Sequence, residues 1–214
     1  MGQAQTEIFA QESLGLLLAG RGDYGSAEEA LFSGIPLARK AGARRYLSAM
    51  LYALAQVRLA QGARGEAREH LEEALALAQQ TGMAFSGPLI LSGVACAAQD
   101  LSEAKSALTQ GEAALRQPCM SHCHLFFYRN AIDVSLRWRE WNEALRYAAM
   151  LDHYVRTEPL PWATLIVKRA HGLAAAGAGK RSDALLSDLR LVRAEIERVG
   201  IPSAVPDIDI ALSA

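Results

Sequence analysis

Large aromatic side chains are scarce in this chain of 214 residues, of which Phe, Trp and Tyr together make up 7%. Residues that favour strands are scarce as well, because Val, Ile and Thr number 22 in all, against 40 Ala and 30 Leu. Alanine and leucine lose little side-chain freedom in a helix, whereas β-branched residues prefer strands. The composition therefore excludes a β-rich fold and predicts an all-α protein, long enough to bury its core without disulfides or metals.

No excess of either charge is present, since 22 Lys and Arg stand against 23 Asp and Glu, a net charge of -1. Direct binding of nucleic acid needs a surplus of positive charge, so we expect no nucleic-acid partner. The longest nearly apolar stretch, residues 87–98, is shorter than the roughly 20 residues of a membrane span. No basic segment followed by an apolar core opens the sequence, and the three cysteines are an odd number. We therefore expect a cytoplasmic protein without a membrane partner.

A motif of about forty residues recurs five times along the chain. Each copy contains a turn, then an acidic or small residue, then an alanine. These alanines are spaced by 40, 37, 40 and 40 residues: Ala27, Ala67, Ala104, Ala144 and Ala184. A small side chain lets two helices approach closely, so we expect each alanine to lie where the helices of a hairpin cross. Four residues later the first four copies have Leu or Ala, but the fifth has Asp188, which predicts a degenerate capping repeat.

Each copy has the pattern of two amphipathic helices, with apolar residues three and four apart and Gly or Pro near the ends. No hairpin can bury its outer face alone, so the hairpins are expected to stack into a right-handed superhelix, an α-solenoid, whose first helices line a concave groove. Gly82 is expected to end its helix in the left-handed conformation, and Pro36 to kink or split the helix around it. We predict a single domain over residues 1–214, with five hairpins near residues 4–41, 44–81, 84–117, 121–157 and 161–200 and a C-terminal cap at 201–214.

These repeats resemble the tetratricopeptide repeat (TPR) family in the pair Leu14-Gly15, the turn Gly22-Asp23-Tyr24 and the five alanines. Their period is longer than the ~34 residues usual in the family. Longer helices of this kind are similar to those in the C-terminal TPR region of bacterial adenylate/guanylate cyclases that carry an ATPase domain, and of LuxR-type ATP-dependent transcription regulators. The resemblance to the cyclase group is carried by the segments RLAQGARGEAREHLEEALALAQQTG, CMSHCHLFFYRNAIDVSL, EWNEALRYAAML and EPLPW.

In TPR proteins the groove-lining positions lie fifteen and eleven residues before the repeat alanine, and the resemblance transfers them to this chain. The first set is Glu12, Tyr52, Leu89, Arg129 and Arg169, and the second is Leu16, Gln56, Gly93, Asp133 and Leu173. We expect a partner-binding groove that contains Tyr52, Gln56, Phe126, Arg129, Asp133 and Arg169. Arg129 and Arg169 are expected to lie side by side on successive repeats of the groove, where they would bind an acidic group of a partner. A solvated inner surface without a ligand is the alternative.

One cluster has the residue types of a metal site, namely Cys119, His122, Cys123 and His124. Structural zinc sites usually take paired ligands from two separate segments, and four ligands spaced this tightly cannot easily surround one ion. We therefore expect the cysteines to pack as small apolar groups at the start of a helix and no metal to bind, with a bound metal as the alternative. Residues 20–25 match G-x-G-x-x-G, but they join two helices instead of following a strand. No carboxylate pair or Ser/His/Asp set suggests catalysis, so we predict neither an enzyme nor a cofactor.

The TPR resemblance implies a function in binding. It implies a non-catalytic protein-interaction or regulatory region of a bacterial signalling protein such as an adenylate/guanylate cyclase. The partner would be a protein or peptide, including the parent cyclase or ATPase domains. The alternative is the small-molecule-sensing region of a LuxR-type ATP-dependent transcription regulator, with an effector in the groove. An enzyme is a third class, and it would require a pocket with convergent titratable groups.

Overall fold

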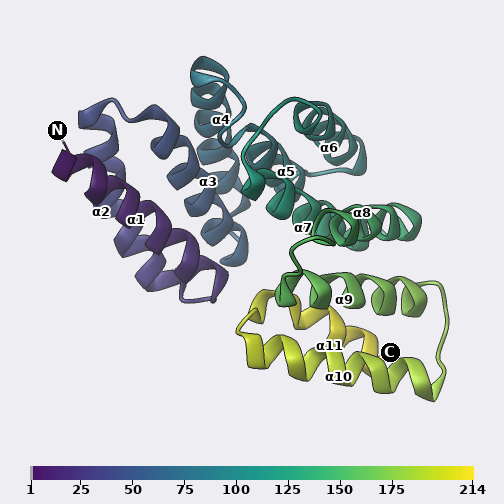
Figure 1. Ribbon diagram of the computed structural model, residues 1–214. Coiled ribbons are helices and arrows are strands. Elements are labelled where there is room, and N and C mark those ends of the chain that lie inside the picture. The colour runs from purple at the N-terminus through teal and green to yellow at the C-terminus, as the bar shows by residue number, and fades with distance from the viewer. Residues whose placement is uncertain (1) are drawn as a thin grey trace. The chain divides into compact units, whose positions relative to one another are not determined.

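The computed structural model describes residues 2–214, with side chains from Ala4 onward (Figure 1). Within that range there is no strand, and the predicted all-α class is confirmed. None of the helices in this range is both long enough and apolar enough to cross a membrane. The helices are α1 (Gly2–Gly20), α2 (Tyr24–Ala41), α3 (Arg44–Ala60), α4 (Arg64–Thr81), α5 (Gly87–Ala97), α6 (Leu101–Leu115), α7 (Ser121–Arg137), α8 (Trp141–Tyr154), α9 (Pro161–Gly177), α10 (Asp183–Val199), the 3-10 helix η1 (Pro202–Ala204) and α11 (Pro206–Ser213).

Consecutive helices pack against each other in pairs. In the first unit of the chain, which ends at Cys123, α1 packs on α2, α3 on α4 and α5 on α6, and α2–α3 and α4–α5 contacts join the pairs. The second unit begins at His124, within α7, and in it α8 packs on α9, α9 on α10, and α11 on both α9 and α10. Phe127 of α7 meets Tyr147 of α8 edge to face, with ring centroids 6.1 Å apart. Consecutive packed pairs of this kind are the arrangement of an α-helical repeat protein.

The repeat alanines of the first four pairs are core residues. Each lies three residues after the first residue of its helix and is completely buried: Ala27, Ala67, Ala104 and Ala144. The facing helix also needs a small residue, because a Cβ added to Gly15 of α1 would lie 2.6 Å from the side chain of Leu31 in α2. Close approach of the two backbones therefore lets a leucine of one helix pack directly on the backbone of the other.

The fifth repeat departs from the predicted alignment. Ala184 and Asp188 are exposed, whereas Leu189 is buried. A Cβ added to Gly172 of α9 would lie 2.6 Å from the side chain of Leu189, so this leucine occupies the crossing point. The loop between α9 and α10 has five residues, against three in the loops of the first four pairs, and this changes which residues of α10 face α9. The half-buried Leu185 therefore corresponds to the repeat alanine. The prediction that the polar Asp188 occupies the contact position four residues after that alanine is wrong.

Two local predictions, at Pro36 and at Gly82, differ in part from the structure. The α2 helix continues without a break through Pro36, so the helix is not split. Near this proline α2 and α3 are in close contact, since a Cβ added to Gly34 would lie 2.7 Å from Cε of Met50. Gly82 follows α4 with a positive φ of 93°, as expected, but its ψ of 133° lies outside the left-handed helical region. Gly42 after α2 does adopt that conformation, with φ 64° and ψ 24°.

Candidate interaction surfaces

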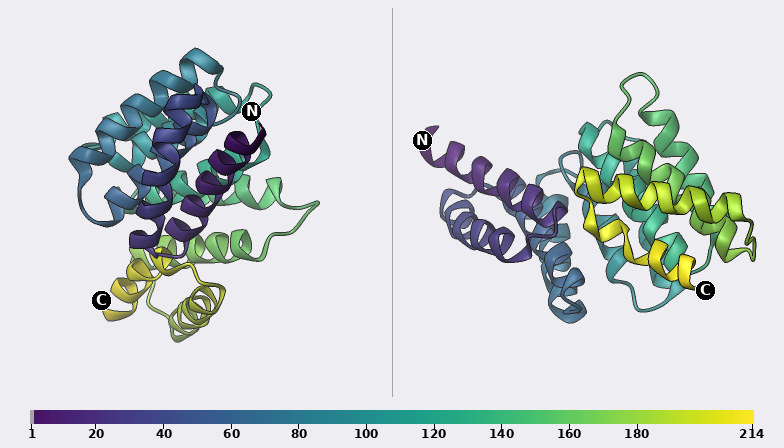
Figure 2. Two further views of the ribbon diagram at one scale, coloured as in Figure 1. Left: turned by 90° about the vertical axis from the view of Figure 1, so that its left-hand side faces the viewer. Right: turned by 90° about the horizontal axis from the view of Figure 1, so that it is seen from below.

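In the second unit, the C-terminal segment formed by η1 and α11 lies against α9 and α10 (Figure 2). Pro202 and Pro206 begin these two helices, where a missing amide hydrogen costs no helical hydrogen bond. The side chains of Ile201, Ala204 and Ile208 anchor the segment and are all buried. These three side chains therefore attach the segment to the other helices of this unit.

Arg169 of α9 connects the C-terminal segment to α7. Its side chain is 2% exposed, and all three guanidinium nitrogens donate hydrogen bonds within the chain. Nε donates to the carbonyl oxygen of Ala204 at 2.9 Å, Nη1 to Oδ1 of Asp133 at 2.5 Å, and Nη2 to Oδ2 of Asp207 at 2.5 Å. A buried guanidinium needs such partners because its removal from water is costly. Arg169 is therefore a structural residue that joins α7, α9 and α11.

Arg129 of α7 also holds the C-terminal segment, because its Nη2 donates to Oγ of Ser203 at 2.9 Å. Phe126, another predicted groove residue, stacks on Trp162 of α9 with ring centroids 6.3 Å apart. The sequence predicts that Arg129 and Arg169 bind an acidic group of a partner. In the structure, the carboxylates that pair with Arg169 come from the chain itself, so this arginine is already occupied by intramolecular ion pairs.

In the first unit, the predicted groove residues of α3 lie within the packing of the helices. Tyr52 is buried, and a Cβ added to Gly93 of α5 would lie 3.0 Å from its ring. Gln56 is half-buried, and its Nε2 is shielded from solvent without a hydrogen-bond partner among residues 2–214. Glu12 of α1, at the position equivalent to Tyr52, is buried too, and burial raises the pKa of its carboxyl group. Tyr52 is thus a core residue, whereas the buried Nε2 of Gln56 has no hydrogen-bond partner in the described part of the chain.

A row of four rings crosses the first unit, and we call it the aromatic row. One ring comes from each of four successive repeats: Phe9 in α1, Tyr46 in α3, Phe85 before α5 and His122 in α7. Successive centroids are 6.2, 5.8 and 5.7 Å apart, and each pair meets edge to face. Phe9 is 54% exposed, and the other three rings are half-buried. Partly exposed aromatic side chains are typical anchors of protein interfaces, because each buries a large apolar area on binding.

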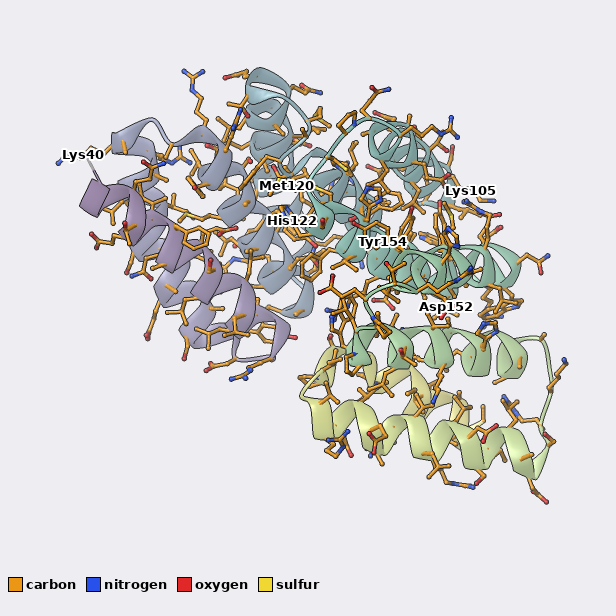
Figure 3. All side chains as sticks on the ribbon, in the orientation of Figure 1. Lys40, Lys105, Met120, His122, Asp152 and Tyr154 are labelled. Atoms are coloured by element: carbon orange, nitrogen blue, oxygen red, sulfur yellow. The ribbon has the colours of Figure 1, made fainter. Side chains whose placement is uncertain are left out.

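Hydrogen bonds fix the last two rings of the aromatic row. His122 donates from Nε2 to the carbonyl oxygen of Phe85 at 2.7 Å, and Cys123 Sγ donates to the same oxygen at 3.3 Å. Burial lowers the pKa of His122, which favours the neutral ring near pH 7. The backbone amide of Met120 donates to the carbonyl oxygen of Ala84 at 2.9 Å; Figure 3 shows Met120 and His122 next to each other at the start of α7. The start of α7 and the segment before α5 are therefore joined, and they hold both rings in place.

The aromatic row was not predicted from the sequence, although its residues recur with nearly the period of the repeats. Successive rings are 37, 39 and 37 residues apart. A residue that recurs at the repeat period lies on the same face of successive hairpins, so this recurrence is a signal of one surface. The signal is hard to see because Phe85 precedes its helix and the fourth ring is an imidazole.

The cysteines and histidines around the start of α7 contribute to packing. The ring of His124 stacks on Tyr154, with centroids 4.6 Å apart. Burial raises the pKa of the Cys123 thiol to about 12 and also raises the pKa of Cys119, and these two thiols are hydrogen-bonded to each other. In the described part of the chain, no group of three or more His, Cys, Asp or Glu side chains is arranged to hold a metal ion.

We predict that the purified protein contains no stoichiometric zinc. The candidate ligands are already engaged in packing, because His122 Nε2 and Cys123 Sγ share the carbonyl oxygen of Phe85 and the ring of His124 stacks on Tyr154. Elemental analysis should find far less than one equivalent of zinc per chain, and a chelator should leave the melting temperature unchanged. A full equivalent of zinc that disappears in the Cys119→Ser, Cys123→Ser variant would contradict the packing role.

Neither a protein-family model nor a curated protein matches this chain. In the second unit, Arg129, Asp133 and Arg169 are grouped around the chain's own C-terminal segment. In the first unit, the aromatic row offers rings from successive repeats to solvent, led by Phe9.

Proposed function

We propose that this chain is a non-catalytic protein-interaction region of a cytoplasmic bacterial signalling protein, similar to the adenylate/guanylate cyclases that carry an ATPase domain. It regulates by binding a protein or peptide, such as the cyclase or ATPase domain of its parent protein. The observation that supports this proposal most is the aromatic row of the first unit. The TPR-like repeats supply the rigid support on which the row is displayed.

The aromatic row suits a peptide that runs along several repeats, because its rings follow one another at 5.7 to 6.2 Å. Each ring is packed by the edge or face of its neighbour, so little side-chain freedom is lost when a partner binds. Phe9 is 54% exposed, and it is therefore the ring that a partner would bury most. An apolar segment of the partner would gain burial along the row, with Phe9 as its principal contact.

Selection of short peptides from a random display library on the immobilised full chain tests this proposal. We expect the selected peptides to bind the Phe9→Ser variant at least about tenfold more weakly than the unchanged protein, because the loss of an aromatic anchor costs roughly 1.4 kcal/mol or more. Phe32→Ser is the matched control, since Phe32 of α2 is 51% exposed but is not part of the aromatic row. Calorimetric affinities that are equal for Phe9→Ser and the unchanged protein would contradict the proposal.

A small-molecule-sensing role, as in the LuxR-type regulators, is the second candidate. The observation in its favour is Nε2 of Gln56, which is shielded from solvent without a hydrogen-bond partner in the described part of the chain. A buried donor is costly unless a ligand or a water molecule accepts a hydrogen bond from it. Native mass spectrometry distinguishes the two candidates: a retained small molecule that is lost in the Gln56→Leu variant would favour the sensor.

A further inference from the structure

One stretch of the first unit contains positive charges and no acidic residue. Residues 30–65 include no Asp or Glu, and the nearest acidic residues on either side are Glu29 and Glu66. The same stretch contains six basic residues: Arg39, Lys40, Arg44, Arg45, Arg58 and Arg64. A carboxylate that pairs with one of these cations must therefore come from another part of the chain or from a partner.

Three of the six cations make contacts that join helices of the first unit. Their acceptors are carboxylates or the carbonyl oxygens at the end of a helix. These acceptors are Glu73 for Arg39, Glu28 and Glu66 for Arg58, and the carbonyl oxygens of Cys96 and Ala98 for Arg64. The packing of the repeats therefore accounts for these three side chains.

The other three cations, Lys40, Arg44 and Arg45, form what we call the basic corner. All three are exposed, and none of them pairs with a carboxylate within the residues that the structure describes. Nη1 of Arg44 donates to Oε1 of Gln80 at 3.4 Å, but this amide oxygen is a neutral acceptor. Only two residues separate the last turn of α2 from the first turn of α3, so the three cations lie at one corner of the unit; Figure 3 shows Lys40 there.

Helix stability does not explain the two arginines of the basic corner. Arg44 and Arg45 are the first two residues of α3, where the partial positive charge at the start of a helix disfavours cations. The N-cap residue Ala43 offers no side-chain acceptor, and no acidic residue lies in the first turn. Lys40 lies in the last turn of α2, where a cation is favourable. An anion bound at this corner would interact favourably with both arginines and with the start of the helix.

The basic corner adjoins the aromatic row. Tyr46 follows Arg45 directly, so the first turn of α3 contains a ring of the row as well as both arginines. The ring of Tyr46 lies between those of Phe9 and Phe85, with centroids 6.2 and 5.8 Å away. A segment bound along the row therefore passes the basic corner where it crosses Tyr46.

We propose that the aromatic row binds an acidic segment of a partner protein, in which apolar side chains contact the rings and Asp or Glu side chains contact the basic corner. This inference rests on the proposed interaction role and adds the charge of the partner. Arginine can bind a carboxylate through two parallel hydrogen bonds, so Arg44 and Arg45 favour Asp and Glu over neutral residues. Lys40 adds to a positive potential that attracts an acidic segment and repels a basic one.

Selection of peptides on the immobilised full chain tests the charge of the partner. Peptides selected from a random display library should contain at least about twice as many Asp and Glu residues as the unselected library. Selection on the Lys40→Gln, Arg44→Gln, Arg45→Gln triple variant should show no such enrichment. An acidic peptide from the first selection should bind the triple variant at least about tenfold more weakly. Added sodium chloride should weaken its binding to the unchanged protein much more than its binding to the triple variant, because salt screens exposed charges.

The Arg156→Gln, Lys180→Gln, Arg190→Gln variant is the matched control. These three side chains are exposed in the second unit, and their substitution removes the same positive charge from the chain. The control should bind the acidic peptide with unchanged affinity and unchanged salt dependence. If the basic-corner variant melts at a markedly lower temperature, Arg45→Gln takes its place, with Arg190→Gln as its control.

Selected peptides without acidic enrichment that bind the basic-corner variant as tightly as the unchanged protein would overturn the inference. If these peptides still bind Phe9→Ser more weakly, the proposed interaction role stands; equal binding to Phe9→Ser would overturn the role and the inference together. Two other occupants would also overturn the inference. A single-stranded oligothymidylate that displaces the acidic peptide and does not bind the basic-corner variant would identify a nucleic acid. A dimer in analytical ultracentrifugation that is lost in the same variant would identify a second copy.

Discussion

Replacing Arg169 with methionine is expected to lower the free energy of unfolding of the second unit by about 3 kcal/mol. The substitution keeps an apolar side chain in the core but removes three hydrogen bonds, including the one to the buried carbonyl of Ala204. It also leaves the carboxylates of Asp133 and Asp207 without the guanidinium that they share. Both carboxylates are partly exposed and regain water, so we expect the lower end of the range typical of a broken buried ion pair. Urea denaturation measures the loss.

Arg193→Met is the matched control for this prediction. Arg193 of α10 also binds α11, through Asp209, but its side chain is 33% exposed and its ion pairs are open to solvent. Exposed ion pairs contribute about 0 to 1 kcal/mol, so this variant should remain close to the unchanged protein. Hydrogen exchange adds a second readout, since only Arg169→Met should release the amides of residues 204–213 to exchange. Equal losses of stability in the two variants would show that Arg169 has no special structural role.

Replacing Ala67 with leucine is expected to lower the free energy of unfolding by about 1 to 3 kcal/mol. Ala67 is completely buried in α4, which packs closely on α3, so the added carbon atoms can be accommodated only if the two helices move apart. Chemical denaturation followed by circular dichroism measures the change. A variant as stable as the unchanged protein would mean that Ala67 does not lie at a close helix crossing.

Ala184→Leu is the control that tests the corrected alignment of the fifth repeat. By sequence this alanine is equivalent to Ala67, and the same substitution would then be equally costly. In the structure Ala184 is exposed, so its replacement should change the free energy of unfolding by less than about 0.5 kcal/mol. A loss as large as that of Ala67→Leu would restore the alignment based on the alanine spacing alone.

The sequence by itself determined that the chain folds into consecutive pairs of helices, and it identified the core alanines of the first four pairs. Both features depend on short-range patterns. Apolar residues three and four apart define the buried face of a helix, and a small residue such as Ala67 marks the place where two helices approach closely. Because these patterns recur with a period near forty residues, each copy supports the interpretation of the others.

Only the tertiary structure decided the register of α10 and the roles of the predicted groove arginines. A longer loop precedes α10, so the residues of this helix that face α9 differ from those predicted. Leu189 is buried there, whereas Ala184 is exposed. The guanidinium of Arg169 is paired with the carboxylate of Asp207. Asp207 lies 38 residues later, in a segment outside the repeats. Contacts of this kind depend on which distant side chains are brought together, and the spacing of residues within a repeat contains no information about a partner that lies beyond it.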